Sequence, residues 1–185
     1  MSYRGKVILL GDPKVGKTSL LARYVDGLFS DEYVQTIGAN FLIKEINLKK
    51  IIDKLNINDK ALKEEIKKKE FKLYFWDITG QKDKLFVTEY YFDYAIAAMI
   101  VFNLSDSESF KNLDFWISKL KEFGGDTPYI IVGNKSDLKR GVDKGSVEEK
   151  IKKLGVKYFE TSAKLNRNVD EAFEALSIQI LDTLR

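Results

Sequence analysis

The chain has 185 residues, of which 44% are hydrophobic, and a net charge of +3 at pH 7. This length suits one domain, residues 1–185, with a single sizeable core. The sequence contains no cysteine and no histidine, which excludes disulfides, thiolate or imidazole metal sites and histidine catalysis within it. Its longest apolar stretch, Ala95 to Phe102, is far shorter than the roughly 20 residues that cross a bilayer, so we expect a buried strand there.

The positive charge is concentrated in one segment. Residues 47–70 hold eight lysines against five acidic residues, a surplus of three, so the rest of the chain is neutral. A nucleic-acid-binding face needs a clustered basic excess together with a reading motif, so we expect no nucleic-acid partner. With no cysteine for lipidation, no glycine after Met1 and no secretory signal pattern, we expect a cytoplasmic protein without an encoded lipid anchor.

Apolar runs typical of strands alternate with segments of helical periodicity along the chain. The predicted strands are Val7–Leu10, Phe41–Leu48, Phe71–Trp76, Ala98–Leu104, Tyr129–Gly133 and Tyr158–Thr161. The predicted helices are Thr18–Tyr24, Ser107–Phe123, Val147–Leu154 and Val169–Leu184. This alternation predicts an α/β fold with a mostly parallel sheet and helices on both faces. The second and third strands lack the usual crossover between them, which favours an antiparallel pair at the sheet edge.

The first strand leads into Gly11-Asp12-Pro13-Lys14-Val15-Gly16-Lys17-Thr18, which matches GxxxxGK[ST]. A strand delivers this loop and a helix leaves it, so the free amides of the helix N-terminus face phosphate. In such a loop the amides around Lys14 to Thr18 cradle the β-phosphate, the Lys17 ammonium reaches the β and γ oxygens, and the Thr18 hydroxyl ligates Mg²⁺. In isolation the motif also fits a turn that binds nothing.

The third strand ends in Trp76-Asp77-Ile78-Thr79-Gly80-Gln81. Here Asp77 can hold Mg²⁺ through a bound water, the Gly80 amide can approach a γ-phosphate, and Gln81 can orient an attacking water. On its own, a strand that ends in Asp-x-x-Gly is often a simple turn.

The fifth strand is followed by Asn134-Lys135-Ser136-Asp137. Asp137 can accept hydrogen bonds from N1–H and the exocyclic amine of guanine, a donor pair that adenine lacks. We expect Asn134 to tie this loop to the phosphate loop, and the aliphatic stem of Lys135 to cover one face of the base. A match of four residues also occurs in plain turns after a strand.

The last strand is followed by Glu160-Thr161-Ser162-Ala163-Lys164. The small side chain of Ala163 lets its backbone N–H approach guanine O6, and Lys164 can lie along the edge of the base. Four motifs in order, each at a strand end, favour a guanine-nucleotide site over coincidence.

With these motifs in this order, the chain resembles a small GTPase of the Ras superfamily, most closely of the Rab type, from Arg4 to about Leu184. Residues Phe29 to Gly38 resemble switch I, and Asp77 to about Tyr91 resemble switch II. The resemblance implies a P-loop G domain with a mixed six-stranded sheet and about five helices. It also implies GTP or GDP and Mg²⁺ as ligands, and a monomer whose partners are GTP-state effectors, GTPase-activating proteins and exchange proteins.

The resemblance further implies roles for single residues. Phe29 packs edge-on against guanine, Thr36 ligates Mg²⁺ in the GTP state, and Gln81 positions the attacking water. The expected catalytic residues are Gln81, Lys17, Thr36 and Gly80. The expected metal ligands are Thr18, Thr36 and, through water, Asp77. The residues expected to contact the nucleotide are Asp12, Pro13, Lys14, Val15, Gly16, Lys17, Thr18, Ser19, Phe29, Tyr33, Thr36, Gly80, Asn134, Lys135, Asp137, Ser162, Ala163 and Lys164.

Several residues depart from the pattern of this family. Pro13 and Lys14 stand where relatives often carry small residues. Proline donates no N–H, and we expect Lys14 to need a positive φ that costs on the order of 1 kcal/mol. Asn40, Thr79 and Lys82 also differ from common Rab residues, and we expect all three on the surface that partners read.

Residues 47–70 lengthen the hairpin between the second and third strands by about 18 residues over a plain Rab hairpin. Apolar residues at helical spacing predict two short amphipathic helices, the first marked by Leu48, Ile51, Ile52 and Leu55 and the second by Leu62 and Ile66. Three interpretations stay open: a solvated helical decoration, a partner-docking element, and a weak contact with anionic membrane.

The sequence therefore predicts a guanine-nucleotide-dependent switch that binds GTP or GDP with Mg²⁺. Hydrolysis is expected to be slow, because no arginine lies in either switch. One alternative is a near-inactive nucleotide-binding scaffold that docks partners through the inserted helices, and Lys17, Thr36 and Gln81 together argue against it. Another is a P-loop kinase or ATPase, which would lack the base selection by Asp137.

Overall fold

The computed structural model describes residues 2–32, 39–46, 64, 68, 70–81 and 89–183. Several predictions fall outside these described residues. They concern Tyr33, Thr36, Lys82, the side chain of Asn40, and the two helices predicted within residues 47–70.

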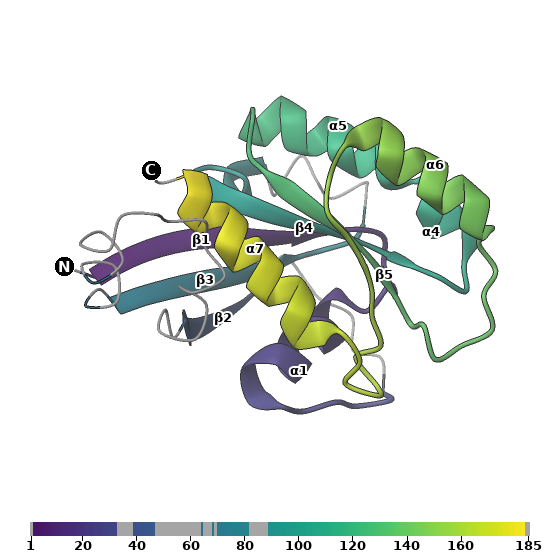
Figure 1. The fold of residues 1–185 in the computed structure, drawn as a ribbon, viewed down its shortest axis with the longest axis horizontal. Helices are drawn as coiled ribbons and strands as arrows, with labels where there is room; N and C mark the ends of the chain where they lie inside the picture. Colours follow the sequence, from purple (N-terminus) through teal and green to yellow (C-terminus); the bar gives the residue numbers. More distant parts are fainter. Residues whose placement is uncertain are drawn as a thin grey trace.

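A six-stranded sheet with the order β2-β3-β1-β4-β5-β6 forms the centre of the protein (Figure 1). Its strands are β1 (Ser2–Leu10), β2 (Ala39–Ile46), β3 (Glu70–Ile78), β4 (Ala95–Asn103), β5 (Tyr129–Asn134) and β6 (Tyr158–Glu160). The β2–β3 pair is antiparallel, with Ala39 opposite Ile78 and Ile46 opposite Phe71, and the other four pairs are parallel. This arrangement confirms the predicted mixed, mostly parallel sheet with an antiparallel edge pair.

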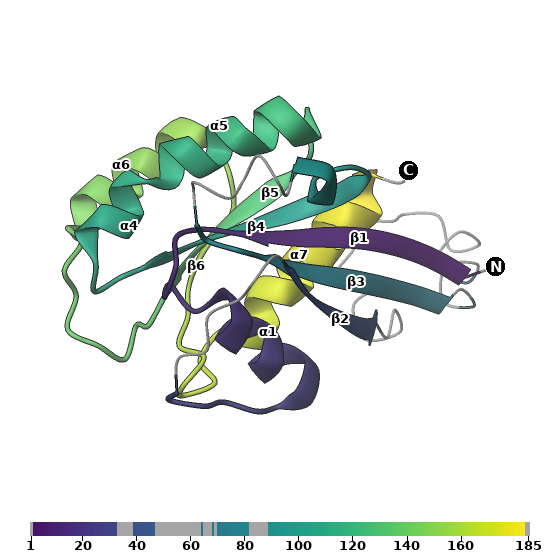
Figure 2. The same cartoon turned by 180° about the vertical axis from the view of Figure 1, so that it is seen from behind.

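Five α-helices of the described residues cover the two faces of this sheet. They are α1 (Lys17–Asp26), α4 (Ser107–Lys111), α5 (Leu113–Gly124), α6 (Lys144–Leu154) and α7 (Val169–Thr183), and a short 3₁₀ helix, η3, spans Glu89–Tyr91. Helices α1 and α7 lie on one face, and α4, α5 and α6 lie on the other (Figures 1 and 2). No helix in the described part of the chain is long and apolar enough to cross a bilayer.

The core has two layers because side chains of a strand alternate between the faces of the sheet. In β1, Val7 and Leu9 belong to the buried cluster that includes α1 and α7. Ile8 and Leu10 belong to the cluster on the opposite face, with α5 and α6. All four are fully buried, so β1 reads as a continuous apolar run, as a central parallel strand should.

One predicted helix differs from the structure. The segment Ser107–Phe123 was predicted as a single helix, but it divides at Asn112 into α4 and α5. Asn112 keeps helical backbone angles, with φ −75° and ψ −3°. The helical spacing of apolar residues therefore continues across the break, and the sequence pattern does not indicate where α4 ends. The side chain of Asn112 does not cap α5; it contacts another part of the molecule, described below.

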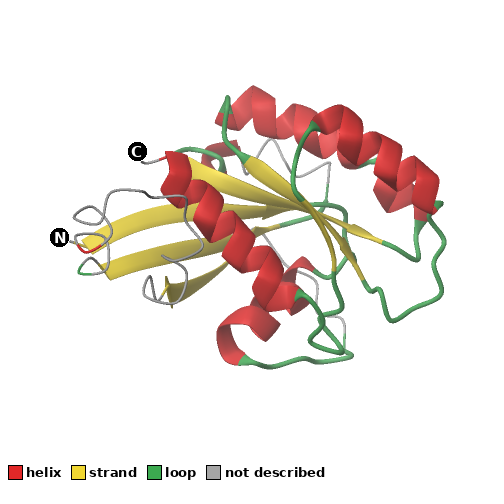
Figure 3. Ribbon diagram, viewed as in Figure 1, coloured by secondary structure: helices red, strands yellow, loops and turns green. Residues whose placement is uncertain are grey.

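The parallel strands end at one edge of the sheet, as Figure 3 shows, where loops follow the strand tips. Strands β1, β3, β5 and β6 end at Leu10, Ile78, Asn134 and Glu160, immediately before or within the four sequence motifs. Ligands of open α/β sheets bind beyond the carboxyl ends of the strands. The topology therefore brings the four motifs together.

Candidate functional site

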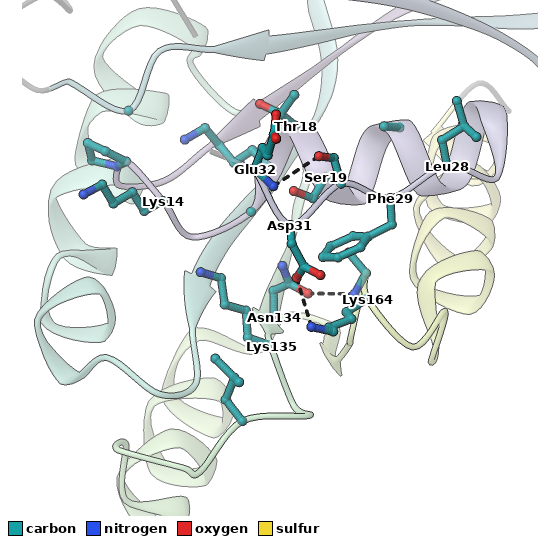
Figure 4. Close-up of a pocket in the computed structure, with 18 of the residues that line it drawn as sticks. Lys14, Thr18, Ser19, Leu28, Phe29, Asp31, Glu32, Asn134, Lys135 and Lys164 are labelled. Carbon is teal, nitrogen blue, oxygen red and sulfur yellow. Dashed lines mark hydrogen bonds and ion pairs between the residues drawn. The ribbon is translucent and has the colours of Figure 1, made fainter. Parts of the chain in front are cut away.

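A cavity of about 680 Å³ lies where the four motif loops meet, a size that suits a small organic ligand. Figure 4 shows several of its lining side chains. Gln81 lines it, and so do most of the described residues predicted to contact a nucleotide, namely Pro13, Lys14, Gly16, Lys17, Thr18, Ser19, Phe29, Gly80, Asn134, Lys135, Asp137, Ala163 and Lys164.

The phosphate-binding loop has an unusual backbone. Lys14 has φ +63°, which confirms the strained conformation predicted for it. Gly16 has φ +97°, and an added Cβ there would lie 2.4 Å from Asn134 Nδ2. Glycine at this position lets the Asn134 amide approach the loop, where it donates to the Val15 carbonyl at 3.0 Å. The predicted tie between the base loop and the phosphate loop is therefore confirmed.

Lys17 is the buried cation of this loop, with only 6% of its surface exposed. Its Nζ donates to the backbone carbonyls of Gly11 at 2.8 Å and Asp12 at 3.0 Å. Burial lowers the pKa of Lys17 to about 8, and the nearby carboxylates of Asp77 and Asp12 partly oppose this shift. A buried ammonium with a lowered pKa is stabilised strongly by an anion beside it.

Thr18 and Asp77 place two oxygen atoms that could ligate a metal ion beside Lys17. The Thr18 hydroxyl donates to the Asp77 carboxylate, and Asp77 is fully buried at the end of β3. Among the described residues there is no group of three or more acidic side chains that could hold a metal. One hydroxyl and one carboxylate nevertheless fit Mg²⁺, which at phosphate sites takes few protein ligands and fills its shell with water and phosphate oxygens.

Gly80 lies directly against the phosphate-binding loop. An added Cβ at Gly80 would lie 2.4 Å from the Pro13 nitrogen and 2.5 Å from the Asp12 carbonyl carbon. This close approach also buries Thr79, which is 1% exposed, and whose hydroxyl accepts from the Gln81 amide at 3.4 Å. The prediction that Thr79 lies on a partner-reading surface is wrong, because the strand end turns onto the phosphate loop and takes this side chain out of solvent.

The loops after β5 and β6 are joined by buried polar side chains. The Asn134 side-chain oxygen accepts from the Thr161 hydroxyl at 3.1 Å and from the Ala163 amide at 3.3 Å. The Ser162 hydroxyl donates to the Asp137 carboxylate at 2.5 Å. Ser162 itself is fully buried, so it orients Asp137 from behind. The Ala163 amide, predicted to approach guanine O6, thus donates to Asn134 in this structure.

Comparison with known proteins agrees with this geometry. The family model for "Ras of Complex, Roc, domain of DAPkinase" matches residues 6–137. Rab-2B of Dictyostelium discoideum is 37% identical over 182 residues, which cover 97% of this chain and 81% of the relative. The chain belongs to the Ras superfamily of small GTPases. Rab-13 of Bos taurus is 34% identical over 95% of this chain and 79% of its own length, and GTP-binding protein YPTM1 of Zea mays is 34% identical over 96% and 78%.

The protein is accordingly a GTP-binding switch of Rab-like type that hydrolyses GTP. GTPases of this family interact with effectors, activating proteins and exchange proteins. The membership agrees with the four motifs, which all meet at the cavity described above.

At the rim of the GTPase cavity, residues of α1 and of the switch I stretch contact the last motif. The Lys164 ammonium contacts the Asp31 carboxylate at 2.9 Å, as Figure 4 shows. Arg23 of α1 donates from Nε to the Ala163 carbonyl at 2.9 Å, and its guanidinium lies 5.8 Å from the ring centroid of Phe29. Helix α1 therefore positions both the last loop and the start of switch I.

Among the predicted site residues that the structure describes, four do not line the GTPase cavity: Asp12, Val15, Asp77 and Ser162. Val15 is buried in the core, and the other three hold neighbouring groups through their side chains. Sequence reasoning missed the lining residues Ala22, Leu28, Ser30, Asp31, Glu32, Thr79 and Leu138. Three of these, residues 30–32, lie inside the stretch that resembles switch I, and that stretch is the signal that could have found them.

Proposed function

We propose that this GTPase is a single G domain, residues 1–185, that binds GTP or GDP with Mg²⁺ and hydrolyses GTP slowly. The observation that carries the proposal is the meeting of four motifs, up to about 150 residues apart in sequence, around one cavity of about 680 Å³. Each motif contributes a different chemistry to that cavity.

The phosphate end is assigned to the loop around Lys17. A lysine ammonium has three N–H donors, and two of them already reach the carbonyls of Gly11 and Asp12. These two bonds hold the ammonium beside the loop backbone, and we propose that its remaining N–H donor binds phosphate oxygens. The amides of Lys14 to Thr18 then bind the β-phosphate at the N-terminus of α1.

We propose that Thr18 ligates Mg²⁺ directly, that Asp77 does so through water, and that Thr36 completes the protein ligands. When bound, the ion neutralises charge on the transferred phosphoryl group. Thr18 lines the cavity and shares a hydrogen bond with Asp77, so the buried Asp77 carboxylate lies next to the hydroxyl that would ligate the ion.

Base selection is assigned to Asp137, Lys135 and Phe29. Ser162 holds the Asp137 carboxylate in place, so that it can accept from guanine N1–H and the exocyclic amine. Lys135 lines the cavity with φ +64°, and burial lowers its pKa; we propose that its aliphatic stem covers one face of the base. Phe29 also lines the cavity, and we propose that its ring packs against the base.

Hydrolysis is assigned to Gln81, with the Gly80 amide on the γ-phosphate. No arginine lies in either switch, and Arg23 of α1 already donates to the carbonyls of Ala163, which lines the cavity, and Gly27. We therefore propose an intrinsic rate on the order of 10⁻⁴ to 10⁻³ s⁻¹, raised strongly when a partner supplies an arginine.

Single-turnover phosphate release from preloaded GTP tests this function. The wild-type protein should release phosphate slowly, and Gln81→Leu should be slower still, with GTP affinity nearly unchanged. Equal turnover of the two proteins would remove Gln81 from the mechanism. Binding of GTP with no phosphate release at all would favour the scaffold alternative, and equal affinity for ATP would favour a P-loop kinase or ATPase.

We propose that GTP-state effectors dock on an aromatic patch formed by Phe41, Trp76 and Tyr91. The Phe41 and Trp76 rings are 4.9 Å apart, and those of Trp76 and Tyr91 are 5.5 Å apart. Phe41 is 43% exposed. Tryptophan and tyrosine are enriched among the residues that contribute most to protein interfaces. Phe41 and Trp76 lie on β2 and β3, the strands that join the two switches, and Tyr91 lies on η3. Phe41→Ala should abolish GTP-dependent effector binding without a change in nucleotide affinity.

We also propose that the protein acts as a monomer in the cytoplasm. The four motifs that line the cavity all lie in this one sequence, so one copy of the chain can supply each of them. The cytoplasm holds both the GTP that the switch consumes and the protein partners of the family.

A further inference from the structure

Asp12 of the phosphate-binding loop directs its carboxylate away from the nucleotide cavity. The Asn112 side-chain amide donates to one carboxylate oxygen at 2.6 Å, and the Trp116 indole N–H donates to the other at 2.7 Å. Asn112 and Trp116 are four residues apart, so both lie on the same face of the helical segment at the start of α5. Trp116 is 1% exposed, whereas Asp12 and Asn112 are half-buried, so the indole anchors the contact on its core side.

The loop needs such support because its own backbone is strained. Pro13 donates no N–H, and Lys14 adopts φ +63°. At Gly11, which has φ +141°, an added Cβ would lie 2.1 Å from the Val101 carbonyl oxygen. Strained conformations of this kind persist only where the surrounding structure holds them.

The backbone at Asp12 also contacts two groups assigned to phosphate binding and hydrolysis. The Asp12 carbonyl accepts from Lys17 Nζ, and Gly80 packs on the bond between Asp12 and Pro13. A displacement of Asp12 would therefore move both an acceptor of the phosphate-binding lysine and the surface against which the start of switch II rests.

The side chain of Asn112 does not cap its own helix. It occupies the N-cap position of α5 but makes no side-chain capping bond there. By contrast, Asp106 caps α4 by accepting from the Glu108 amide, and Asp143 caps α6 by accepting from the Ser146 amide. The Asn112 amide is thus used for the phosphate-binding loop instead of for helix stability.

We propose that Asn112 and Trp116 are positioning residues that hold the phosphate-binding loop at Asp12, so that α5 sets how fast the protein releases GDP. The proposal rests on the function proposed above. Two charge-assisted hydrogen bonds hold the loop from behind, and without them the loop loses the geometry in which its amides and Lys17 bind phosphate.

An exchange of donor and acceptor tests this proposal. Asn112→Asp places two carboxylates at the 2.6 Å contact, and we expect GDP release about 10-fold faster or more. The double variant Asp12→Asn with Asn112→Asp restores both bonds, because the introduced amide donates to position 112 while its oxygen accepts from Trp116. We expect its release rate within about threefold of wild type. A purely structural role of Asn112 in the helix would not be rescued from the loop.

Lys111→Ala is the matched control, because Lys111 is the exposed last residue of α4 and pairs only with Glu108 among the contacts described. It should release GDP at the wild-type rate. Trp116→Phe keeps a buried ring but removes the N–H, and should speed release about fivefold.

Release at the wild-type rate from Asn112→Asp, or no recovery in the double variant, overturns the proposal. Should Asn112→Asp fail to fold, an unchanged rate in Trp116→Phe overturns it. A wild-type protein that does not bind GDP would instead refute the proposed function.

Discussion

The guanine side and the phosphate side of the cavity are held in different ways. On the guanine side, the buried side chains of Asn134, Thr161 and Ser162 bond to one another's loops and to Asp137. On the phosphate side, a buried ammonium is bonded only to carbonyls in the described contacts, and the loop is held at Asp12 by side chains that lie outside the cavity.

This difference indicates that the base and the phosphates of the nucleotide are recognised in different ways. Buried, mutually satisfied polar groups give the guanine side one geometry before the base binds. The phosphate side holds a cation that needs an anion and a strand end, Gly80, that rests on the loop. We expect base identity to be selected by a rigid site, and the phosphate state to be sensed by a site that the ligand itself completes.

The largest effect is expected from a substitution that removes base recognition on the guanine side. Asp137→Asn should lower GTP affinity about 1,000-fold, because two hydrogen bonds to a charged acceptor contribute about 1.5–3 kcal/mol each. It should raise affinity for xanthosine nucleotides, whose C2 carbonyl can accept from the introduced amide. Titration with fluorescent GTP and xanthosine triphosphate measures both. Ser162→Ala is the control that keeps the carboxylate and should lose far less. Unchanged GTP affinity in Asp137→Asn would contradict the assignment.

A second substitution disturbs only the contact between Gly80 and the phosphate-binding loop. In Gly80→Ala the added Cβ would lie 2.4 Å from the Pro13 nitrogen, so the strand end must move away from the loop. Hydrolysis should fall about 100-fold, the typical cost of losing one backbone donor on the reacting phosphoryl group. Affinity for GDP should stay close to wild type. Gly145→Ala is a matched control, since its Cβ would meet only Asp143 Oδ2 at 3.3 Å. Wild-type turnover in Gly80→Ala would show that this contact is dispensable.

Nucleotide binding should depend on pH through Lys17. Its pKa is about 8 without nucleotide, and bound phosphate raises it, so binding above pH 8 takes up a proton. Affinity for GDP should therefore fall between pH 8 and 9, by up to about tenfold per pH unit. The stability of the nucleotide-free protein should change with pH in the direction opposite to nucleotide affinity. The unfolded chain keeps the Lys17 proton up to about pH 10.5, so the free energy of unfolding should increase as pH rises above 8. A flat affinity from pH 7 to 9 by calorimetry would contradict the burial of the charge.

The smallest effect concerns the ion pair that links the two sides at the rim. The Asp31 and Lys164 side chains are 73% and 50% exposed, and such pairs contribute about 1 kcal/mol or less. Asp31→Asn should speed GDP release by less than about fivefold, and added salt should erase the difference. Stopped-flow release at low and high salt provides the measurement. An increase above about tenfold would mean that the rim, and not the loops beneath it, controls release.

The sequence by itself determined the four motifs, the alternation of strands and helices, and the antiparallel edge pair. These features depend on residues close together in the chain: the spacing from Gly11 to Thr18, the apolar run of β4, and the missing crossover between β2 and β3. The positive φ at Lys14 could also be predicted, because the loop geometry of the motif demands it whatever the rest of the protein does.

Only the tertiary structure decided which side chains support the motifs. The break at Asn112, its contact with Asp12 across 100 residues, and the bond from Ser162 to Asp137 depend on elements that meet only in the folded sheet. Thr79 became a buried residue for the same reason, because Gly80 packs on a loop that lies about 70 residues earlier in the chain. Local spacing specifies which groups a site contains, whereas close packing of distant segments specifies how firmly each is held.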